Sequence, residues 1–130
     1  MQGFRRSLRH ERRHDCHPYH GTTWQRALAI LENGPDPEFK EPGELTTAEG
    51  ISFAPTEVAY EQGEPAIIAR GKAALFPREG GPALLEIEMP QYLIDISLDL
   101  TCEIRFLRGC GLEELLSEWD NLSKRIHRLQ

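Results

Sequence analysis

The sequence lacks long apolar runs. None of its 130 residues lies in an uninterrupted apolar stretch near the roughly 18 residues that a membrane-spanning helix needs. The N-terminus has basic residues but no apolar segment of the kind found in a secretory signal peptide. We therefore expect a soluble protein with no membrane partner.

Cysteine is also scarce. The three cysteines, Cys16, Cys102 and Cys110, cannot form an even disulfide framework. A reducing compartment suits such a sequence, because disulfides persist mainly in oxidising environments. The expected location is the cytoplasm.

Motifs of familiar catalytic chemistry are missing. The chain contains no G-x-S-x-G nucleophile elbow, Walker loop, dinucleotide fingerprint or H-E-x-x-H zinc motif. Beyond residues 1–20 its only histidine is His127, so the sequence places no general base beside a nucleophile. These absences predict a protein that is not an enzyme and needs no cofactor.

Charge is divided unevenly along the chain. Residues 1–20 hold five arginines against Glu11 and Asp15, a balance of +3, whereas residues 21–130 hold ten basic and nineteen acidic side chains, a balance of −9. Four of the five histidines also lie in residues 1–20. We interpret residues 1–20 as a basic, histidine-rich arm and residues 21–130 as a single α+β domain whose acidic surface disfavours nucleic acid.

An amphipathic helix follows the arm. Trp24, Ala27, Leu28 and Leu31 recur at helical spacing and predict a helix over 23–32. Thr22 is the expected cap at its start, with Gln25 completing a capping box. The sequence Asn-Gly-Pro that follows predicts its end.

Strand-like segments occupy the middle of the chain, and a second helix is predicted over 111–129 from apolar residues three and four apart. The segments before the longest strand are 47–54, 56–60, 65–76 and 83–89. The predicted fold class is α+β. We expect an antiparallel, curved β-sheet of four or five strands, packed against an N-terminal and a C-terminal amphipathic helix.

The longest alternating segment runs from Ile94 to Phe106. A straight strand of that length would span roughly 40 Å, whereas a compact body of this size is roughly 34 Å across. The strand must therefore curl, split between two sheets or reach a second subunit. Curling is the favoured prediction, because neither glycine nor proline interrupts the segment. A homodimer remains an alternative.

Acidic residues dominate the polar side of the predicted sheet. Carboxylates four residues apart on a strand are about 13 Å from each other, which is too far to share a calcium ion. We instead predict an acidic recognition surface for a partner protein. Its residues are Glu86, Glu88, Asp95, Asp99 and Glu103.

The arm carries two further candidate sites. Its arginines are suited to phosphates or nucleic acid, and its imidazole and thiol groups are ligands that zinc prefers. The candidate anion-binding residues are Arg5, Arg6, Arg9, Arg12 and Arg13. The candidate metal ligands are His14, Cys16, His17 and His20.

These observations favour a non-enzymatic adaptor or regulatory module that recognises a partner protein through its sheet face or helices. One alternative is a regulator that binds nucleic acid or metal through the arm. Another is a carrier of small apolar ligands, if the curved sheet leaves a pocket against the C-terminal helix.

Overall fold

The computed structural model of the protein describes residues 17–38, 50–54, 63–100 and 103–130. Its elements in chain order are β1 (Tyr19–Thr23), α2 (Trp24–Asn33), β2 (Ile51–Phe53), α3 (Glu64–Leu75), β3 (Pro82–Glu88), α4 (Gln91–Asp95), β4 (Leu98–Leu100), β5 (Glu103–Phe106), α5 (Leu112–Glu118), the 3₁₀ helix η1 (Trp119–Asn121) and β6 (Ser123–Arg128). The predicted strand 56–60 and the candidate arginines of the arm lie outside the described residues.

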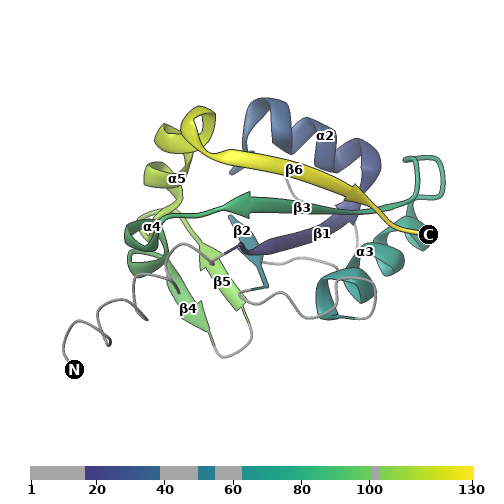
Figure 1. The fold of residues 1–130 in the computed structure, drawn as a ribbon, viewed down its shortest axis with the longest axis horizontal. Helices are drawn as coiled ribbons and strands as arrows, with labels where there is room; N and C mark the ends of the chain where they lie inside the picture. The colour runs from purple at the N-terminus through teal and green to yellow at the C-terminus, as the bar shows by residue number, and fades with distance from the viewer. Residues whose placement is uncertain (1–16, 39–49, 55–62, 101–102) are drawn as a thin grey trace, which may run out of the picture.

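The described residues form an α+β fold with two small antiparallel sheets (Figure 1). One sheet has the strand order β1-β3-β6, and the other has the order β2-β5-β4. A bridge between Tyr19 and Ala54 connects them. The predicted α+β class and antiparallel pairing are therefore confirmed, whereas one curved sheet of four or five strands is not what the chain forms.

Strand β3 is the central strand of the β1-β3-β6 sheet, and its apolar residues are buried on both faces. Leu84 and Leu85 are adjacent, point to opposite faces as strand residues do, and are both fully buried. Leu85 belongs to the main core beneath α2 and α5, whereas Leu84 packs beside Tyr19 under α3. The inward orientation predicted for Leu85, Ile87 and Met89 is confirmed by their burial.

Helix α2 lies close to its prediction. It begins one residue later than expected, because the hydroxyl of Thr23, not Thr22, accepts a hydrogen bond from the Arg26 amide at 3.3 Å. Gly34 ends it with a φ of 78°, a conformation that glycine adopts without steric cost. Local signals therefore suffice for this element.

The strand predicted over 65–76 is wrong, because these residues belong to α3. Pro65 occupies the first turn, where its missing N–H costs no helical hydrogen bond. Ala66 and Ala69 are fully buried against the sheet, three residues apart, while Ile67 and Ile68 are exposed. Small buried residues thus let α3 pack closely with only part of its apolar surface covered.

The single long strand predicted from Ile94 to Phe106 is also wrong. Ile94 lies in the short helix α4, and the chain then forms the antiparallel pair β4 and β5. The reversal removes the length conflict without curling, a split between sheets or a second subunit. Alternation of apolar and polar residues identifies strand-like positions but carries no information about where the chain turns back.

The predicted C-terminal helix ends early. Helix α5 and the 3₁₀ turn η1 occupy its first half, and β6 occupies the second, paired with β3. Leu122 and Ile126 are four residues apart, a spacing that keeps two side chains on one face of either a helix or a strand. Pairing with the edge of β3 that β1 leaves open therefore makes residues 123–128 a strand and not a helix.

Within the described part of the chain, no helix has the length and apolar character needed to cross a membrane. Helices α2 and α3 instead pack on the β1-β3-β6 sheet (Figure 1), with α2 against β3 and β6 and α3 against β1 and β3.

Gly21 permits the close approach of α3 to β1. A Cβ atom at this position would lie 2.1 Å from the carbonyl oxygen of Pro65 and 3.1 Å from the amide nitrogen of Ala69. Both atoms are backbone, so no side-chain rotation relieves the clash. The absence of a side chain at Gly21 therefore sets the distance between helix and sheet.

Replacing Gly21 by alanine is expected to reduce the free energy of unfolding by about 1–3 kcal/mol, because α3 must move away from β1. Urea denaturation measures the effect. The matched control is Gly71→Ala on the same helix, where a Cβ meets no described heavy atom within 4 Å. Helix propensity predicts that this control gains about 1 kcal/mol. Equal stability of Gly21→Ala and the wild type would contradict the close approach.

Candidate functional site

A cleft of about 730 Å³ lies between the sheets and α3. Its lining comes from β1, β2 and β5, from α3, and from α2 with the turn after it. Volumes of about 300–1,000 Å³ are typical of sites for small molecules. The cleft therefore has the size of a ligand site.

A row of polar side chains crosses three adjacent strands along this cleft. The Nδ1 atom of His20 on β1 is 2.7 Å from the carbonyl oxygen of Ser52 on β2. The Nε atom of Arg105 on β5 donates to the Ser52 hydroxyl at 3.0 Å, and its Nη2 atom lies 3.1 Å from a carboxylate oxygen of Glu103. His20, Ser52, Arg105 and Glu103 all line the cleft. We call these four residues the polar row.

His20 is uncharged at neutral pH. Burial and, to a smaller extent, the positive charge of Lys72 lower the pKa of its imidazole to about 3, against the opposing effect of the Ser52 carbonyl. A carbonyl oxygen only accepts hydrogen bonds, so Nδ1 carries the proton and Nε2 is left as an acceptor. The Phe53 ring stands edge-on at a centroid distance of 5.8 Å.

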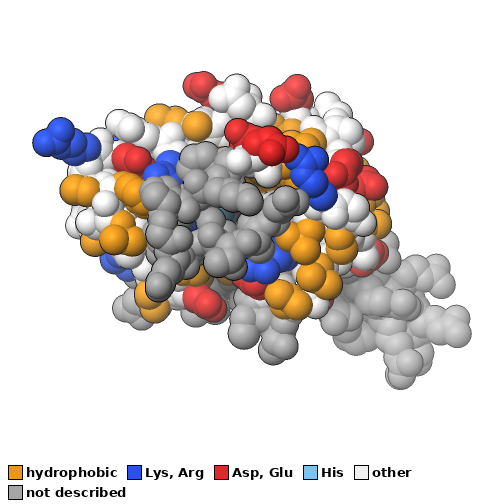
Figure 2. All heavy atoms as spheres, turned by 180° about the vertical axis from the view of Figure 1, so that it is seen from behind, with side chains coloured by type: hydrophobic (Ala, Val, Ile, Leu, Met, Phe, Trp, Pro, Cys, Tyr) orange, Lys and Arg blue, Asp and Glu red, His pale blue; other side chains and the backbone are white. Residues whose placement is uncertain are grey.

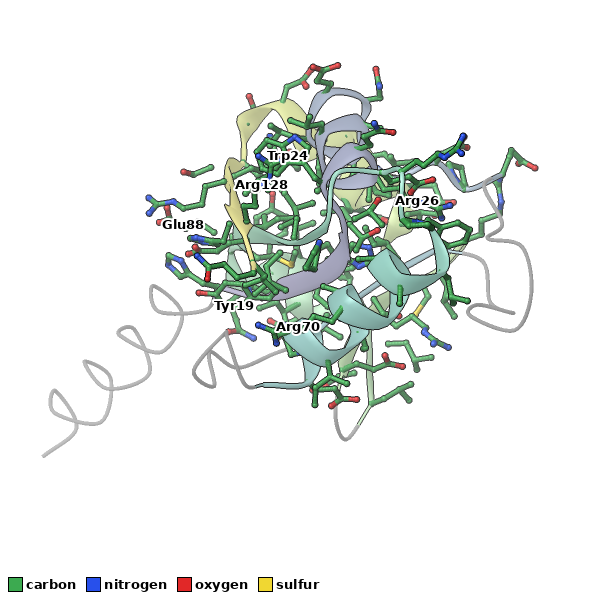
Figure 3. All side chains as sticks on the ribbon, turned by 90° about the vertical axis from the view of Figure 1, so that its right-hand side faces the viewer. Tyr19, Trp24, Arg26, Arg70, Glu88 and Arg128 are labelled. Carbon is green, nitrogen blue, oxygen red and sulfur yellow. The ribbon has the colours of Figure 1, made fainter. Side chains whose placement is uncertain are left out.

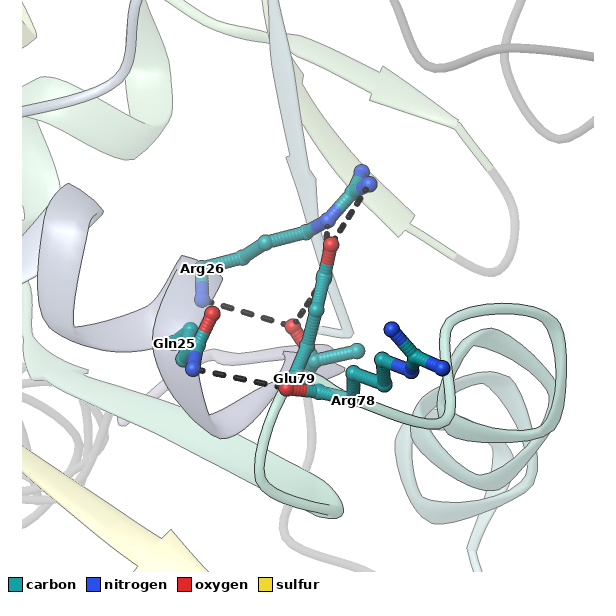
Figure 4. A network of polar contacts seen from close by, with 5 residues as sticks. Gln25, Arg26, Arg78 and Glu79 are labelled. Atoms are coloured by element: carbon teal, nitrogen blue, oxygen red, sulfur yellow. Dashed lines mark hydrogen bonds and ion pairs between the residues drawn. The ribbon is translucent and has the colours of Figure 1, made fainter.

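Arg26 forms a second polar wall of the cleft. Its Nε atom donates to a carboxylate oxygen of Glu79 at 2.7 Å, and the Thr23 hydroxyl donates to the same oxygen at 2.8 Å (Figure 4). The guanidinium also lies over the Phe76 ring, 4.0 Å from its centroid. Figure 3 shows Arg26 on the opposite side of the β1–α2 segment from Trp24. The Arg26 side chain is therefore oriented by two partners, Glu79 and Phe76.

The Arg26 bond also changes the acidity of Glu79. Hydrogen bonding to Arg26 lowers the pKa of the Glu79 carboxyl, Thr23 and the charge of Arg26 act in the same direction, and burial opposes them. The carboxylate is therefore charged at neutral pH and holds the guanidinium in place.

The remaining lining combines apolar and charged groups. Ile30, Ile68 and Leu75 contribute apolar surface from the two helices. Charged side chains at the cleft besides those already named are Lys72, Asp36 and Glu64. The lining thus holds three cationic and three acidic side chains, within a domain whose overall balance is strongly acidic.

This arrangement can recognise a polar ligand by several kinds of group at once. It offers a neutral acceptor in His20, a hydroxyl in Ser52, a guanidinium in Arg105 and a carboxylate in Glu103. A histidine with a pKa of about 3 is neither a cation nor an effective base at neutral pH.

The candidate metal ligands have separate partners. The Nδ1 atom of His17 lies 2.6 Å from Glu86, whereas His20 bonds to Ser52 within the cleft. His14 and Cys16 lie outside the described residues. Among the residues that the structure describes, no three His, Cys, Asp or Glu side chains are grouped as a metal site.

The candidate acidic surface is distributed over four elements. Glu86 and Glu88 are on β3, Asp95 is at the end of α4, Asp99 is on β4 and Glu103 is on β5. Glu88, Asp95 and Asp99 are exposed, and Glu103 belongs to the polar row.

Glu86 is largely buried between two imidazoles. Its carboxylate oxygens lie 2.6 Å from His17 Nδ1 and 2.6 Å from His127 Nε2. Burial alone would raise the pKa of this carboxyl, but the hydrogen bonds to His127 and His17 hold it below its ordinary value. Glu86 therefore joins β3 and β6 to the residues before β1.

Sequence reasoning missed the cleft residues Ser52 and Arg105. Each is a polar residue between two buried apolar ones on a short strand, Ser52 in Ile-Ser-Phe and Arg105 in Ile-Arg-Phe. The sequence shows this local pattern. It does not show the antiparallel pairing that brings Ser52 and Arg105 together across 53 positions.

Replacing Glu79 by glutamine is expected to lower the free energy of unfolding at pH 7 by about 1–3 kcal/mol, because Arg26 loses a charged acceptor. The Glu79 pKa is lower in the folded chain than its ordinary 4.5, so this stabilisation is present above pH 4.5. It is lost as the pH falls through the lowered pKa. Urea unfolding at pH 7 and pH 3 should therefore show a difference that narrows at pH 3.

The matched control is Glu88→Gln at an exposed position of β3, which should change stability by less than about 0.5 kcal/mol. A stability difference between Glu79→Gln and the wild type that is equally large at both pH values would contradict the charged pairing.

Comparisons with known proteins found no relative of this chain. No protein-family model matches the chain, and no curated protein or solved structure is significantly similar to it.

Proposed function

We propose that the cleft binds a small phosphorylated ligand with sugar-type hydroxyl groups and a flat, largely apolar group, which is the chemistry of a nucleotide. The observation that carries this proposal is the uncharged His20 at the polar row, with its tautomer set by Ser52. Volume, charge and apolar lining support the same class of ligand.

Hydroxyl recognition follows from the His20 tautomer. Its Nδ1 proton is engaged by the Ser52 carbonyl, so Nε2 accepts a hydrogen bond from a ligand O–H or N–H group. The low pKa keeps this acceptor available across the neutral range. A partly buried acceptor of this kind discriminates against ligands that lack the donor, because it would then remain unpaired.

Anion recognition follows from Arg105 and Lys72. A guanidinium carries five N–H donors, and Ser52 and Glu103 engage only Nε and Nη2 of Arg105 among the described residues. Arginine and phosphate form strong, directional hydrogen bonds. The charge of Lys72 reaches far enough into the cleft to act on His20 and therefore adds to the local positive potential.

The earlier adaptor hypothesis receives less support from the geometry. The five acidic residues proposed for partner binding do not share one strand face, since they come from four elements. Figure 2 shows hydrophobic groups separated by charged side chains of both signs on the face that it presents. Binding of a partner protein stays a prediction without a defined surface. The cleft, in contrast, has the volume of a small-molecule site and polar, charged and apolar side chains in its lining.

A second candidate function is group transfer at a sugar carbon of the bound ligand, favoured by the position of Glu103 in the polar row. A carboxylate stabilises the positive charge that develops at such a carbon when its leaving group departs with the bonding electrons. The same carboxylate then accepts the proton of the incoming nucleophile, with water as the simplest case. This proposal departs from the sequence-based expectation that the protein is not an enzyme.

Isothermal titration calorimetry with adenosine, AMP, ADP, NAD⁺ and ribose 5-phosphate tests the binding proposal. We expect at least one nucleotide to bind the wild type. His20→Phe keeps a flat ring but removes the acceptor, and Arg105→Met removes the cation. Each should weaken binding, by about threefold to tenfold for His20 and by tenfold or more for Arg105.

Arg78→Met, at an exposed position outside the cleft, is the matched control and should bind as the wild type does. Failure of every probe to bind the wild type, or unchanged affinity in both cleft variants, would overturn the proposed function.

Glu103→Gln tests group transfer separately from binding. Incubation of the wild type with NAD⁺ or a nucleoside, followed by chromatography of the products, should reveal release of the base. The variant should lose about 10²-fold or more of this rate, a much larger factor than the change in its affinity for the same ligand. A wild type that binds nucleotides but never cleaves them would eliminate this second function and leave the first intact.

A further inference from the structure

Helix α3 contains a glycine, Gly71, that no contact among the described residues explains. Gly71 lies in the interior of the helix, where glycine is less favourable than alanine. Its backbone is not in the left-handed region, and a Cβ there would meet no described heavy atom within 4 Å. Among the described residues, neither backbone conformation nor packing therefore requires glycine at this position.

The same residue lies in the lining of the cleft between two exposed apolar side chains. Ile68 and Leu75 are three residues before and four residues after Gly71, so all three share one side of the helix. Their side chains remain 45% and 59% exposed. We call Ile68, Gly71 and Leu75 the α3 strip.

The strip stands in contrast to the polar row. Sheet residues such as Arg105 supply hydrogen bonds and charge, whereas the strip supplies apolar surface around bare backbone. Lys72, next to Gly71 on the helix, contributes positive charge to the same cleft. A ligand with an anionic part and a flat apolar part therefore finds positive charge at Arg105 and Lys72 and apolar surface at the α3 strip.

We infer that the α3 strip is the seat of the flat apolar group of the ligand, the base in the case of a nucleotide, and that Gly71 determines whether this group fits. This inference rests on the proposed nucleotide function of the cleft. A planar ring can approach the helix backbone at Gly71 more closely than at any residue with a side chain. Ile68 and Leu75 border the ring and lose their exposure when it binds.

The decisive experiment compares Gly71→Leu with Ala74→Leu. Both add a large side chain to α3, but Ala74 is exposed and lies outside the cleft lining. Calorimetry with ADP and with ribose 5-phosphate separates contacts to the base from contacts to the phosphate. We expect Gly71→Leu to weaken ADP binding tenfold or more and to leave ribose 5-phosphate binding within twofold of the wild type. Ala74→Leu should leave both affinities unchanged.

A second variant separates ligand binding from folding. Gly71→Ala should raise the melting temperature by a few degrees, because alanine is the better helix former, while ADP binding weakens severalfold. A variant that is more stable yet binds less tightly cannot be explained by damage to the fold. Ile68→Ala should likewise weaken ADP more than ribose 5-phosphate.

The outcomes distinguish this inference from the proposal on which it rests. If the wild type binds ADP and Gly71→Leu binds it equally well, the seat of the base is elsewhere and the inference is wrong, although the cleft remains a nucleotide site. Equal loss of ADP and ribose 5-phosphate in Gly71→Leu would also overturn it, because the added side chain would then act on the phosphate. If no probe binds the wild type, the proposed function and this inference both fail.

Discussion

Strand β1 is hydrogen-bonded on both edges, and the cleft depends on this double pairing. It pairs with β3 along its length, while Tyr19 exchanges two backbone hydrogen bonds with Ala54, at 3.1 and 2.7 Å. That bridge holds the smaller sheet against the larger one and brings His20 beside Ser52. Gly21 on the same strand allows α3 to pack closely against β1. One short strand therefore positions both the polar row and α3 at the cleft.

Hydrogen bonds and ion pairs among the polar side chains of the cleft hold each of them in its orientation. Glu79 orients Arg26, Ser52 orients both His20 and Arg105, and Arg105 in turn holds Glu103. Such mutual bonding keeps each group in one geometry before any ligand arrives, which reduces the entropy lost on binding. It also explains how an acidic protein presents cationic groups locally, since Arg26 and Arg105 are each held by nearby oxygens.

Local signals predicted the fold only where one segment contained all the information. The helix ending at Gly34 has its apolar spacing and its stop signal within the same stretch, and it forms as expected. The stretch after Pro65 has no clear period, and burial of Ala66 and Ala69 against β1 makes it a helix. Of the cleft residues, the sequence singled out His20 as a metal ligand and Glu103 as part of a protein-binding surface, but it had no means of joining them.

The sequence by itself determined the α+β class, the first helix, the inward face of β3 and the absence of familiar catalytic motifs, because each depends on short-range spacing or on composition. Tertiary structure decided the rest. Pairing with β3 made the end of the chain a strand, reversal between β4 and β5 shortened the predicted long strand, and the Tyr19–Ala54 bridge assembled the polar row. The physical reason is that hydrogen bonds between distant strands and close helix packing arise from segments whose proximity no local pattern encodes.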